Sequence, residues 1–210
     1  MARKRIMTSV ITGDIISSRK VKDSVWITRL KKTLSLEGKS PETWQIYRGD
    51  SFQVEIKNPA QAFLTAIRIK ATIKSIKNLD VRMAIGIGEK IIMNSKITES
   101  NGEAFIHSGE KLENLKKEKQ TLAIKTPWVG FDKEMNVCFR LALIAIDNWS
   151  PSSSELIKIL IDNRNITQTA LAKRLRVTQP SVSERQNRSS YTEIMELEDL
   201  YREKINHLIL

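Results

Sequence analysis

Apolar residues recur with two different periods along the first 146 residues. Runs that are unbroken or alternate with polar residues predict strands at 5–12, 44–47, 52–56, 81–87 and 122–125, and residues 90–93 extend the fourth. Apolar positions at helical spacing predict helices at 23–36, 59–76, 102–115 and 139–146. A tight turn at 48–51 joins the second and third strands as a hairpin. The mixture of strands and helices predicts an α+β fold.

The order of these elements is strand, helix, two strands, helix, strand, which is typical of a ferredoxin-like antiparallel sheet. The clearest break follows residue 146, where turn-forming residues and Pro151 interrupt the apolar pattern. We therefore predict a sheet domain at 1–146, a linker at 147–153 and a small all-α domain at 154–210. The last helix, predicted at 192–208, carries an apolar stripe that either closes the small domain or pairs with a second subunit.

Two short helices with a tight turn between them are predicted at 167–188. Thr167 and Thr178 are suited to cap the two helices, because their hydroxyl oxygens can accept from free backbone N–H groups. Pro180 falls in the first turn of the second helix, where its missing N–H does little harm. The apolar side of the pair is formed by Leu171, Ala172, Leu175 and Val182. This arrangement is the helix-turn-helix pattern.

The second of these helices leaves a row of polar side chains on its outer face. Gln and Asn can pair with adenine, Arg with guanine, and Ser with several bases. Residues 164–188 also hold six basic residues against one acid, Glu184, which suits contact with phosphates. The residues predicted to contact double-stranded DNA are Gln168, Lys173, Arg174, Thr178, Gln179, Ser181, Ser183, Arg185, Asn187 and Arg188. The alternative is a plain helical hairpin that packs against another surface.

The segment resembles helix-turn-helix regulators as a family. The resemblance rests on Gln168, Leu171, Ala172, Leu175, Val177, Thr178, Gln179, Ser181, Val182 and Ser183. One turn position departs from the family pattern: it is usually glycine, because its backbone is left-handed, and this chain has Arg176. A non-glycine residue there costs about 1 kcal/mol, so the turn remains attainable.

Composition adds limits to this picture. Lys and Arg number 35 against 24 Asp and Glu, a net charge of +11 that favours a polyanionic partner such as nucleic acid. One cysteine and two histidines provide neither a disulfide framework nor a zinc ligand set. No stretch is apolar enough to span a membrane, and the basic N-terminus lacks the apolar run of a signal peptide. We therefore expect a cytoplasmic protein without a membrane partner.

Two acids stand where predicted strands end. Asp14 follows the first strand, and Asp50 lies in the hairpin turn. In a ferredoxin-like sheet these strands are neighbours, so the carboxylates can meet at one edge. They would then repel unless a divalent cation, a shared proton or a cation such as Arg48 neutralised them. A pair of this kind can hold magnesium ions. The alternative is that both are turn residues that accept from nearby N–H groups.

Residues 10–112 resemble the catalytic fold of class III nucleotide cyclases. The stretches that carry the resemblance are 14–18 (DIISS), 49–52 (GDSF), 82–88 (RMAIGIG) and 102–112 (GEAFIHSGEKL). The whole chain is similar to the SatD family, in which a domain of this kind precedes a helix-turn-helix. The resemblance implies a nucleotide-cyclase-like sheet with Asp14 and Asp50 as metal ligands, and ligand contacts from Ile15, Arg48, His107 and Lys111.

Three positions depart from the cyclase pattern. His107 stands in place of the transition-state Asn, Lys111 in place of the transition-state Arg, and Ile46 in place of the purine-selecting Lys. Loss of one preorganised donor typically lowers the rate by about 10²–10³-fold, and Lys lacks the forked geometry of Arg. We therefore expect no useful cyclisation, with no cofactor required and Mg²⁺ and a nucleotide as optional ligands. His107 can equally be an ordinary polar residue on a helix surface.

These observations favour a DNA-binding transcriptional regulator. The helix-turn-helix would read DNA as a homodimer, because two copies read two half-sites, and the sheet domain would dimerise or sense a nucleotide effector. The alternative is a metal-dependent nucleotide-processing enzyme with an appended helix-turn-helix. A third interpretation is an adaptor whose helical tail binds protein.

Overall fold

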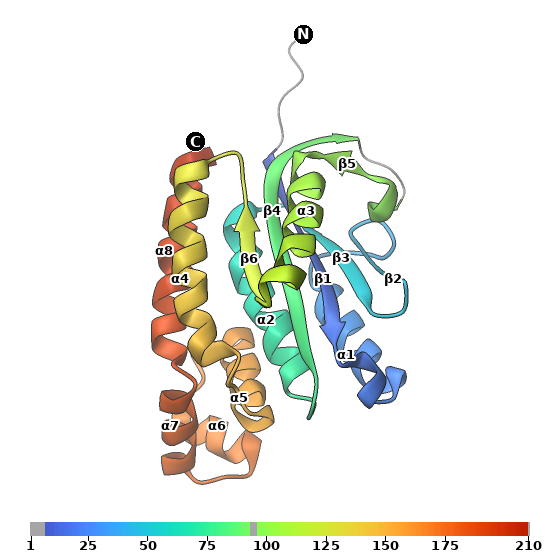
Figure 1. Cartoon of the computed structure of the whole chain (residues 1–210). Coiled ribbons are helices and arrows are strands. Elements are labelled where there is room, and N and C mark those ends of the chain that lie inside the picture. The colour runs from blue at the N-terminus through green and yellow to red at the C-terminus, as the bar shows by residue number, and fades with distance from the viewer. Residues whose placement is uncertain (1–6, 93–95, 210) are drawn as a thin grey trace.

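The computed structural model of the chain describes residues 7–92 and 96–209, and within them it has one six-stranded sheet with helices around it (Figure 1). The central strand β1 (Met7–Ile16) pairs antiparallel with β3 (Ser51–Ile56) on one side and β4 (Asp80–Ile92) on the other. At one edge β2 (Trp44–Tyr47) pairs with β3. β5 (Asn101–Gly102) pairs with β4 antiparallel and β6 (Leu122–Lys125) pairs with it in parallel. The fold is therefore α+β, with a mainly antiparallel sheet.

Helices cover both faces of the sheet. On one face α1 (Asp23–Leu34) packs on α2 (Ala62–Lys74), and the 3-10 helix η2 (Pro59–Gln61) leads into α2. On the other face α3 (Glu103–Glu118) lies across β4 and β1. Gly86 permits this close approach, because a Cβ there would lie 2.2 Å from the carbonyl oxygen of Ala104. α4 (Val129–Ile146) lies beside β6, and single 3-10 turns occur at Ser18–Lys20 (η1) and Ile97–Glu99 (η3).

Most predicted elements of the sheet region are present, with shifted ends. β2 and β6 begin and end at the predicted residues. β1 runs past its predicted end at residue 12, because it pairs with β4 as far as Ile16, so Asp14 lies inside a strand and not after it. The helix predicted from residue 139 already begins at Val129. Residues 5, 6 and 93, which the sequence assigns to strands, lie outside the described residues.

The four helices that follow pack directly on the rest of the chain. α5 (Pro151–Asp162) packs on α2, α6 (Gln168–Leu175) on α7 (Gln179–Arg188), and α8 (Tyr191–Ile209) runs back beside α4 (Figure 1). Their buried residues belong to the same hydrophobic core as the sheet, among them Leu171, Val182, Ile194, Tyr201 and Ile205. The two predicted domains thus share one core. No helix in the described part of the chain is long and apolar enough to cross a membrane.

Tyr201 of α8 fastens the end of the chain to the start of α2. Its ring packs with Phe63 and Phe139, which are stacked at 4.5 Å between centroids. Its buried hydroxyl donates to the carbonyl oxygen of Pro59 at 2.9 Å. Burial raises the pKa of Tyr201 above its ordinary value, so the phenol remains protonated and keeps this donor.

The segment predicted as a linker, residues 147–153, is a tight junction, and α5 begins within it. Trp149 is 5% exposed, and its indole N–H donates to the carbonyl oxygen of Ser189 at 2.9 Å. The buried ammonium of Lys70 on α2 lies 2.8 Å from Asp80 Oδ1 and 2.7 Å from Asp147 Oδ1. A buried charge is tolerated when it is paired. These contacts fasten α2 and β4 to the end of α4.

Candidate functional site

α6 and α7 are joined by a tight turn that the residues between them specify. Thr167 and Thr178 cap the two helices, and their hydroxyl oxygens accept from the N–H groups three residues further on at 3.2 and 3.4 Å. Arg176 ends α6 in the left-handed region, at φ 55° and ψ 46°, the conformation expected where glycine is usual. Val177 then donates its N–H to the carbonyl oxygen of Ala172 at 3.0 Å, which closes the turn.

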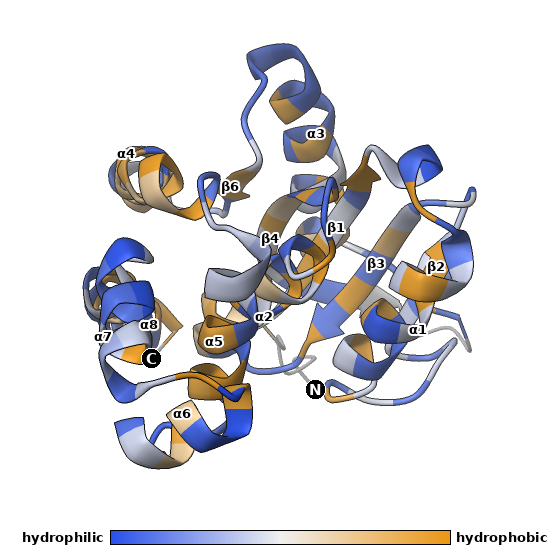
Figure 2. Ribbon diagram, turned by 90° about the horizontal axis from the view of Figure 1, so that it is seen from below, coloured by the Kyte–Doolittle hydropathy of each residue, from blue (hydrophilic) through white to orange (hydrophobic). Residues whose placement is uncertain are grey.

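Buried apolar side chains fix the orientation of both helices. Leu171 and Val182 are completely buried, and Ala172 is nearly so. Because residues three or four apart share one face of a helix, burial of these positions turns the opposite faces outward. The ribbon of α7 is hydrophilic over most of its length and lies at the periphery of the molecule (Figure 2). α7 therefore presents polar side chains to solvent.

One polar stripe of α7 consists of Gln179, Ser183 and Asn187, which are spaced four residues apart. Gln179 and Asn187 are exposed, and Ser183 is half-buried. Nε2 of the Gln179 side chain donates to Oε1 of the Gln168 side chain at the start of α6. Within the described residues, neither the carbonyl oxygen of Gln179 nor the amide group of Gln168 has another partner, so both can reach an outside molecule.

A second polar stripe of α7 faces a cavity of about 480 Å³ beside the junction that leads into α5. Its members are Ser181, Glu184, Arg185 and Arg188. Ser181 shares a 2.9 Å hydrogen bond with Thr178, and Arg188 pairs with Glu184 one turn earlier. Arg185 is half-buried and lines the cavity together with Trp149. Arg185 thus lies on a different face from Gln179 and Asn187.

Exposed positive charge adjoins these stripes. Lys173 and Arg174, in the last turn of α6, are exposed. In the part of the chain that the structure describes, neither forms an ion pair. Because Arg188 pairs with Glu184, which is the single acid of residues 164–188, the remaining charge of this surface is positive.

The two carboxylates of the sheet lie at one end of it. Asp14 is paired in register with Ser51 on β3 and with Arg82 on β4. The N–H of Ile15 donates to the carbonyl oxygen of Asp50 at 3.0 Å, which joins the hairpin turn to β1 beside Asp14. The charge of Asp50 acts on Asp14. The sequence-based expectation that the first strand lies beside the hairpin strand is met by the pairing of β1 with β3, and Asp50 lies in the turn next to Ser51.

Protein groups hold each of the two carboxylates. Arg82 Nη1 lies 3.2 Å from Asp14 Oδ2, and Ser18 Oγ donates to Asp50 Oδ2 at 2.8 Å. The cation paired with Asp14 is therefore Arg82, whereas the sequence suggested Arg48. Arg48 is exposed in the hairpin turn at φ 51° and has no ion pair among the described residues. The sequence did carry a signal for Arg82, a charged residue that begins an otherwise apolar stretch of strand.

The environment of Asp14 disfavours the charged form of its carboxyl group. Burial raises the pKa of Asp14 above its ordinary value of 3.8, Arg82 and Lys116 oppose this only in part, and Asp50 adds to the rise. Asp14 Oδ1 and Arg82 Nε are both buried without a hydrogen-bond partner in residues 7–92 and 96–209. An unpartnered buried polar atom costs about 1–3 kcal/mol. A free carboxylate oxygen beside a second carboxylate is compatible with a bound cation.

Two other residues predicted to contact a ligand are directed elsewhere. His107 Nδ1 donates to the carbonyl oxygen of Ile87 at 2.7 Å. Ile87 and Arg82, the partner of Asp14, are five residues apart on β4, which corresponds to roughly 17 Å. Lys111 pairs with Glu118 at 3.7 Å and lines a cavity of about 520 Å³ between α3, β6 and α4. Within a single copy of the chain, His107 and Lys111 therefore do not lie beside Asp14 and Asp50.

The surroundings of Asp14 thus differ from the predicted set. The side chain of Ile15 is 3% exposed and belongs to the hydrophobic core. The α3 charges that act on Asp14 are those of Lys116 and Glu113. Among the described residues, no three His, Cys, Asp or Glu side chains cluster as a metal site.

The fold defines an α+β protein with a mainly antiparallel sheet and C-terminal helices packed on it. The SatD family model matches residues 8–198, and the chain therefore belongs to the SatD family. Two solved structures of a bacterial light-regulated adenylyl cyclase are weakly similar, with TM-scores of 0.38 and 0.37 and sequence identities of 9% and 11%. The similarity covers 58% of this chain and less than half of those chains, 43% and 42%. No curated protein matches the sequence.

Proposed function

We propose that this chain is a cytoplasmic, DNA-binding transcriptional regulator in which α6 and α7 form a helix-turn-helix. The observation that carries the proposal is the exposed polar stripe of α7, on a helix anchored by Val182 and entered through the left-handed turn at Arg176. Helices held in this way read base edges in the major groove. A hairpin that only packs on the protein accounts for the buried Val182 but gives no role to the exposed Gln179 and Asn187.

In this proposal Gln179 and Asn187 are the principal base-reading residues, with Ser183 between them. Gln and Asn side chains can contact N6 and N7 of adenine together. The bond from Gln179 to Gln168 orients both amides before DNA arrives, which lowers the entropy lost on binding. A guanine contact from Arg185 requires its half-buried side chain to leave the cavity that it lines.

Lys173, Arg174 and Arg188 supply the phosphate contacts in this proposal. Each cation that neutralises a phosphate releases counterions, so affinity must fall with salt. The test is selection of duplexes from a random pool, followed by fluorescence anisotropy over a range of salt concentrations. A selected sequence and a negative slope of log affinity against log salt are expected. Binding without any sequence preference contradicts base reading.

We also propose that the regulator is a homodimer, because one recognition helix reads few base pairs and two-fold partners read two half-sites. α4 offers an apolar stripe for this contact, in which Val137, Leu141 and Ile144 are 46%, 64% and 69% exposed. Light scattering on the purified chain measures the oligomeric state. Leu141→Glu is expected to give a folded monomer, and a monomeric wild-type protein contradicts the proposal.

A metal-dependent reaction on a nucleotide is the second candidate. It is favoured by the unpartnered Oδ1 of buried Asp14 and by the nearby charge of Asp50. Mg²⁺ prefers carboxylate oxygens and keeps several waters, so these two residues would hold it with solvent completing its shell. Bound there, the ion would supply positive charge to a nucleotide phosphate.

The two candidates are separated by incubating the chain with ATP, GTP, CTP or UTP and Mg²⁺ or Mn²⁺. A cyclic product supports the enzyme. Nucleotide binding without turnover, lost in Asp14→Asn, supports a sheet that senses a nucleotide effector for the DNA-binding helices. The placement of His107 and Lys111 away from Asp14 favours the second outcome.

A further inference from the structure

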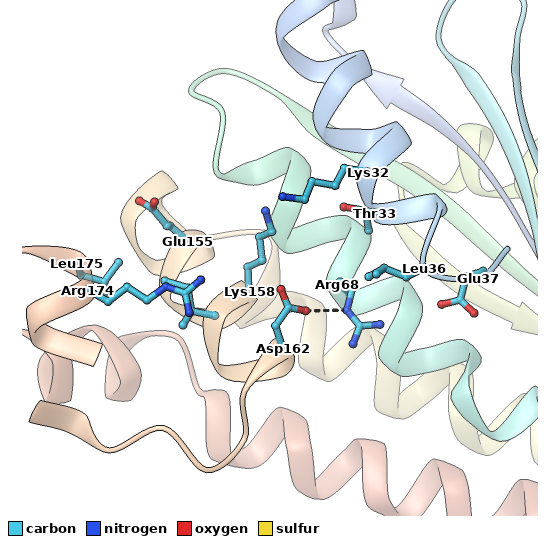
Figure 3. A pocket seen from close by; sticks show the side chains of 11 residues that line it. Lys32, Thr33, Leu36, Glu37, Arg68, Glu155, Lys158, Asp162, Arg174 and Leu175 are labelled. Atoms are coloured by element: carbon cyan, nitrogen blue, oxygen red, sulfur yellow. Dashed lines mark hydrogen bonds and ion pairs between the residues drawn. The ribbon is translucent and has the colours of Figure 1, made fainter. Parts of the chain in front are cut away.

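A cavity of about 690 Å³ lies where the C-terminal helices meet the helical layer of the sheet (Figure 3). α1 and α2 line it on one side, and α5 and α6 on the other. Its volume falls within the range of about 300–1,000 Å³ that is typical of small-molecule sites. Neither the carboxylate pair nor the α7 stripes contribute to it.

Cations enter this cavity from both sides. Lys32 comes from α1 and Arg68 from α2, while Lys158 comes from α5 and Arg174 from α6. Arg68 is neutralised by Asp162, whose Oδ1 lies 3.2 Å from its Nε. Among the residues that the structure describes, Lys32, Lys158 and Arg174 have no ion-pair partner. The cavity therefore holds positive charge that the protein leaves uncompensated.

The ammonium groups of Lys32 and Lys158 point toward one another (Figure 3). The same view places the carboxylates of Glu155 and Glu37 at opposite ends of the cavity, away from the two ammonium groups. Glu37 already accepts a hydrogen bond from Thr65 at 2.9 Å. Like charges that face each other without an acid between them are unfavourable unless an anion joins them.

The electrostatics of Lys158 agree with this geometry. Burial lowers the pKa of Lys158 below its ordinary value, and the positive charges of Arg29 and Lys32 add to this effect. Asp162 and, more weakly, Glu155 oppose it, but the Asp162 carboxylate is already engaged by Arg68. An anion between the two lysines would favour the charged form of Lys158.

We propose that this cavity binds a phosphate-bearing small molecule, with the phosphate between Lys32 and Lys158. A phosphate group carries up to two negative charges and three strong acceptor oxygens, so it can satisfy both ammonium groups at once. The apolar part of the ligand lies against Leu36, Ile159 and Leu175, which line the same cavity. Leu36 is 63% exposed, and a ligand would cover it. The site does not depend on the DNA-binding proposal.

The test uses the full chain with sodium pyrophosphate and AMP as probes, in EDTA and at constant ionic strength. Calorimetry is expected to show binding, and the melting temperature is expected to rise because the probe binds the native state. Lys32→Gln and Lys158→Gln each remove a charged hydrogen bond and are expected to weaken binding about tenfold or more. Lys31→Gln, which changes an exposed neighbour outside the cavity, keeps the wild-type affinity.

Failure of both probes to bind overturns the proposal, as does equal affinity in wild type and in the two cavity variants. Displacement of pyrophosphate by a short duplex would assign these lysines to the DNA backbone and also overturn it. Circular dichroism confirms folding of each variant. Lys158→Gln removes a partly desolvated charge, so its fold is expected to persist. None of these binding measurements requires sequence-specific DNA recognition. Their outcome can therefore be interpreted whether or not the chain binds DNA.

Discussion

The α7 surface and the carboxylate end of the sheet present polar groups in different states. Gln179 and Asn187 are exposed, and the side-chain contact of Gln179 is to another exposed amide in Gln168. Asp14 is half-buried against Arg82, and Asp50 is held by Ser18. Gln179 and Asn187 can meet a partner without rearrangement, whereas the second region offers the buried, unpartnered Oδ1 of Asp14. The contacts that a side chain already makes within the protein are therefore as informative about function as its chemical type.

The largest expected effect concerns base recognition. Gln179→Ala and Asn187→Ala are each expected to reduce discrimination between the selected duplex and single-base variants by about 1–3 kcal/mol, because a paired contact to a base edge is lost. Anisotropy titrations on both duplexes measure this difference. Asn206→Ala, an exposed change on α8, is the matched control. An equal loss on all duplexes contradicts base reading by α7.

Asp14→Asn tests the other region. Because burial raises the pKa of Asp14, the folded chain binds this proton more tightly than the unfolded chain, so ionisation lowers stability as pH rises above about 3.8. The Asn variant lacks this cost, and its free energy of unfolding relative to wild type is expected to rise from acidic to neutral pH. Urea titrations at several pH values measure this, with the exposed Asp199→Asn as control. A loss of stability in the Asn variant that instead grows as pH rises, toward about 3–5 kcal/mol, would show that the ion pair with Arg82 outweighs burial.

Lys173→Ala separates phosphate contacts from base contacts on the proposed DNA-binding surface. It is expected to weaken binding to selected and altered duplexes alike and to reduce the salt slope by about 1, because one phosphate contact is lost. Salt titrations of both duplexes measure this. Lys77→Ala, an exposed lysine between α2 and β4, is expected to leave the slope unchanged. A change of sequence preference in Lys173→Ala would assign Lys173 to a base.

The smallest expected effect is that of Arg176→Gly. Glycine enters the left-handed region without the steric cost of about 1 kcal/mol that other residues carry, so the variant is expected to be more stable by up to that amount. Urea unfolding measures the difference, and Arg176→Ala, which keeps the steric cost, is expected to match wild type. A less stable glycine variant would reveal a favourable contact of the Arg176 side chain.

Local signals predicted α6 and α7 well. The caps at Thr167 and Thr178 and the left-handed Arg176 depend on residues within one helical turn, and the structure has all three. The partner of Asp14 could not be predicted in this way. Arg82 is 68 positions away, and it meets Asp14 only through the register of β1 against β4.

The contacts between the sheet and the C-terminal helices could not be predicted for the same reason, because they join residues that are far apart in the sequence. Lysine side chains are rarely buried, so the sequence alone favours a position on the protein surface for Lys70. Its partners Asp80 and Asp147 lie on other elements, and only the packed fold brings the three together. The turn-forming residues at 147–153 suggested a linker, and in the structure Trp149 and Ser153 of this segment are buried.

The bond from Tyr201 to Pro59 joins positions 142 residues apart. During synthesis the ribosome makes α2 and α4 well before α8, so Phe63 and Phe139 remain without their aromatic neighbour for much of translation. Chains with uncovered apolar surface aggregate readily and engage chaperones. Until α8 has been made, the nascent chain therefore leaves Phe63 and Phe139 without the contact that Tyr201 provides in the folded protein.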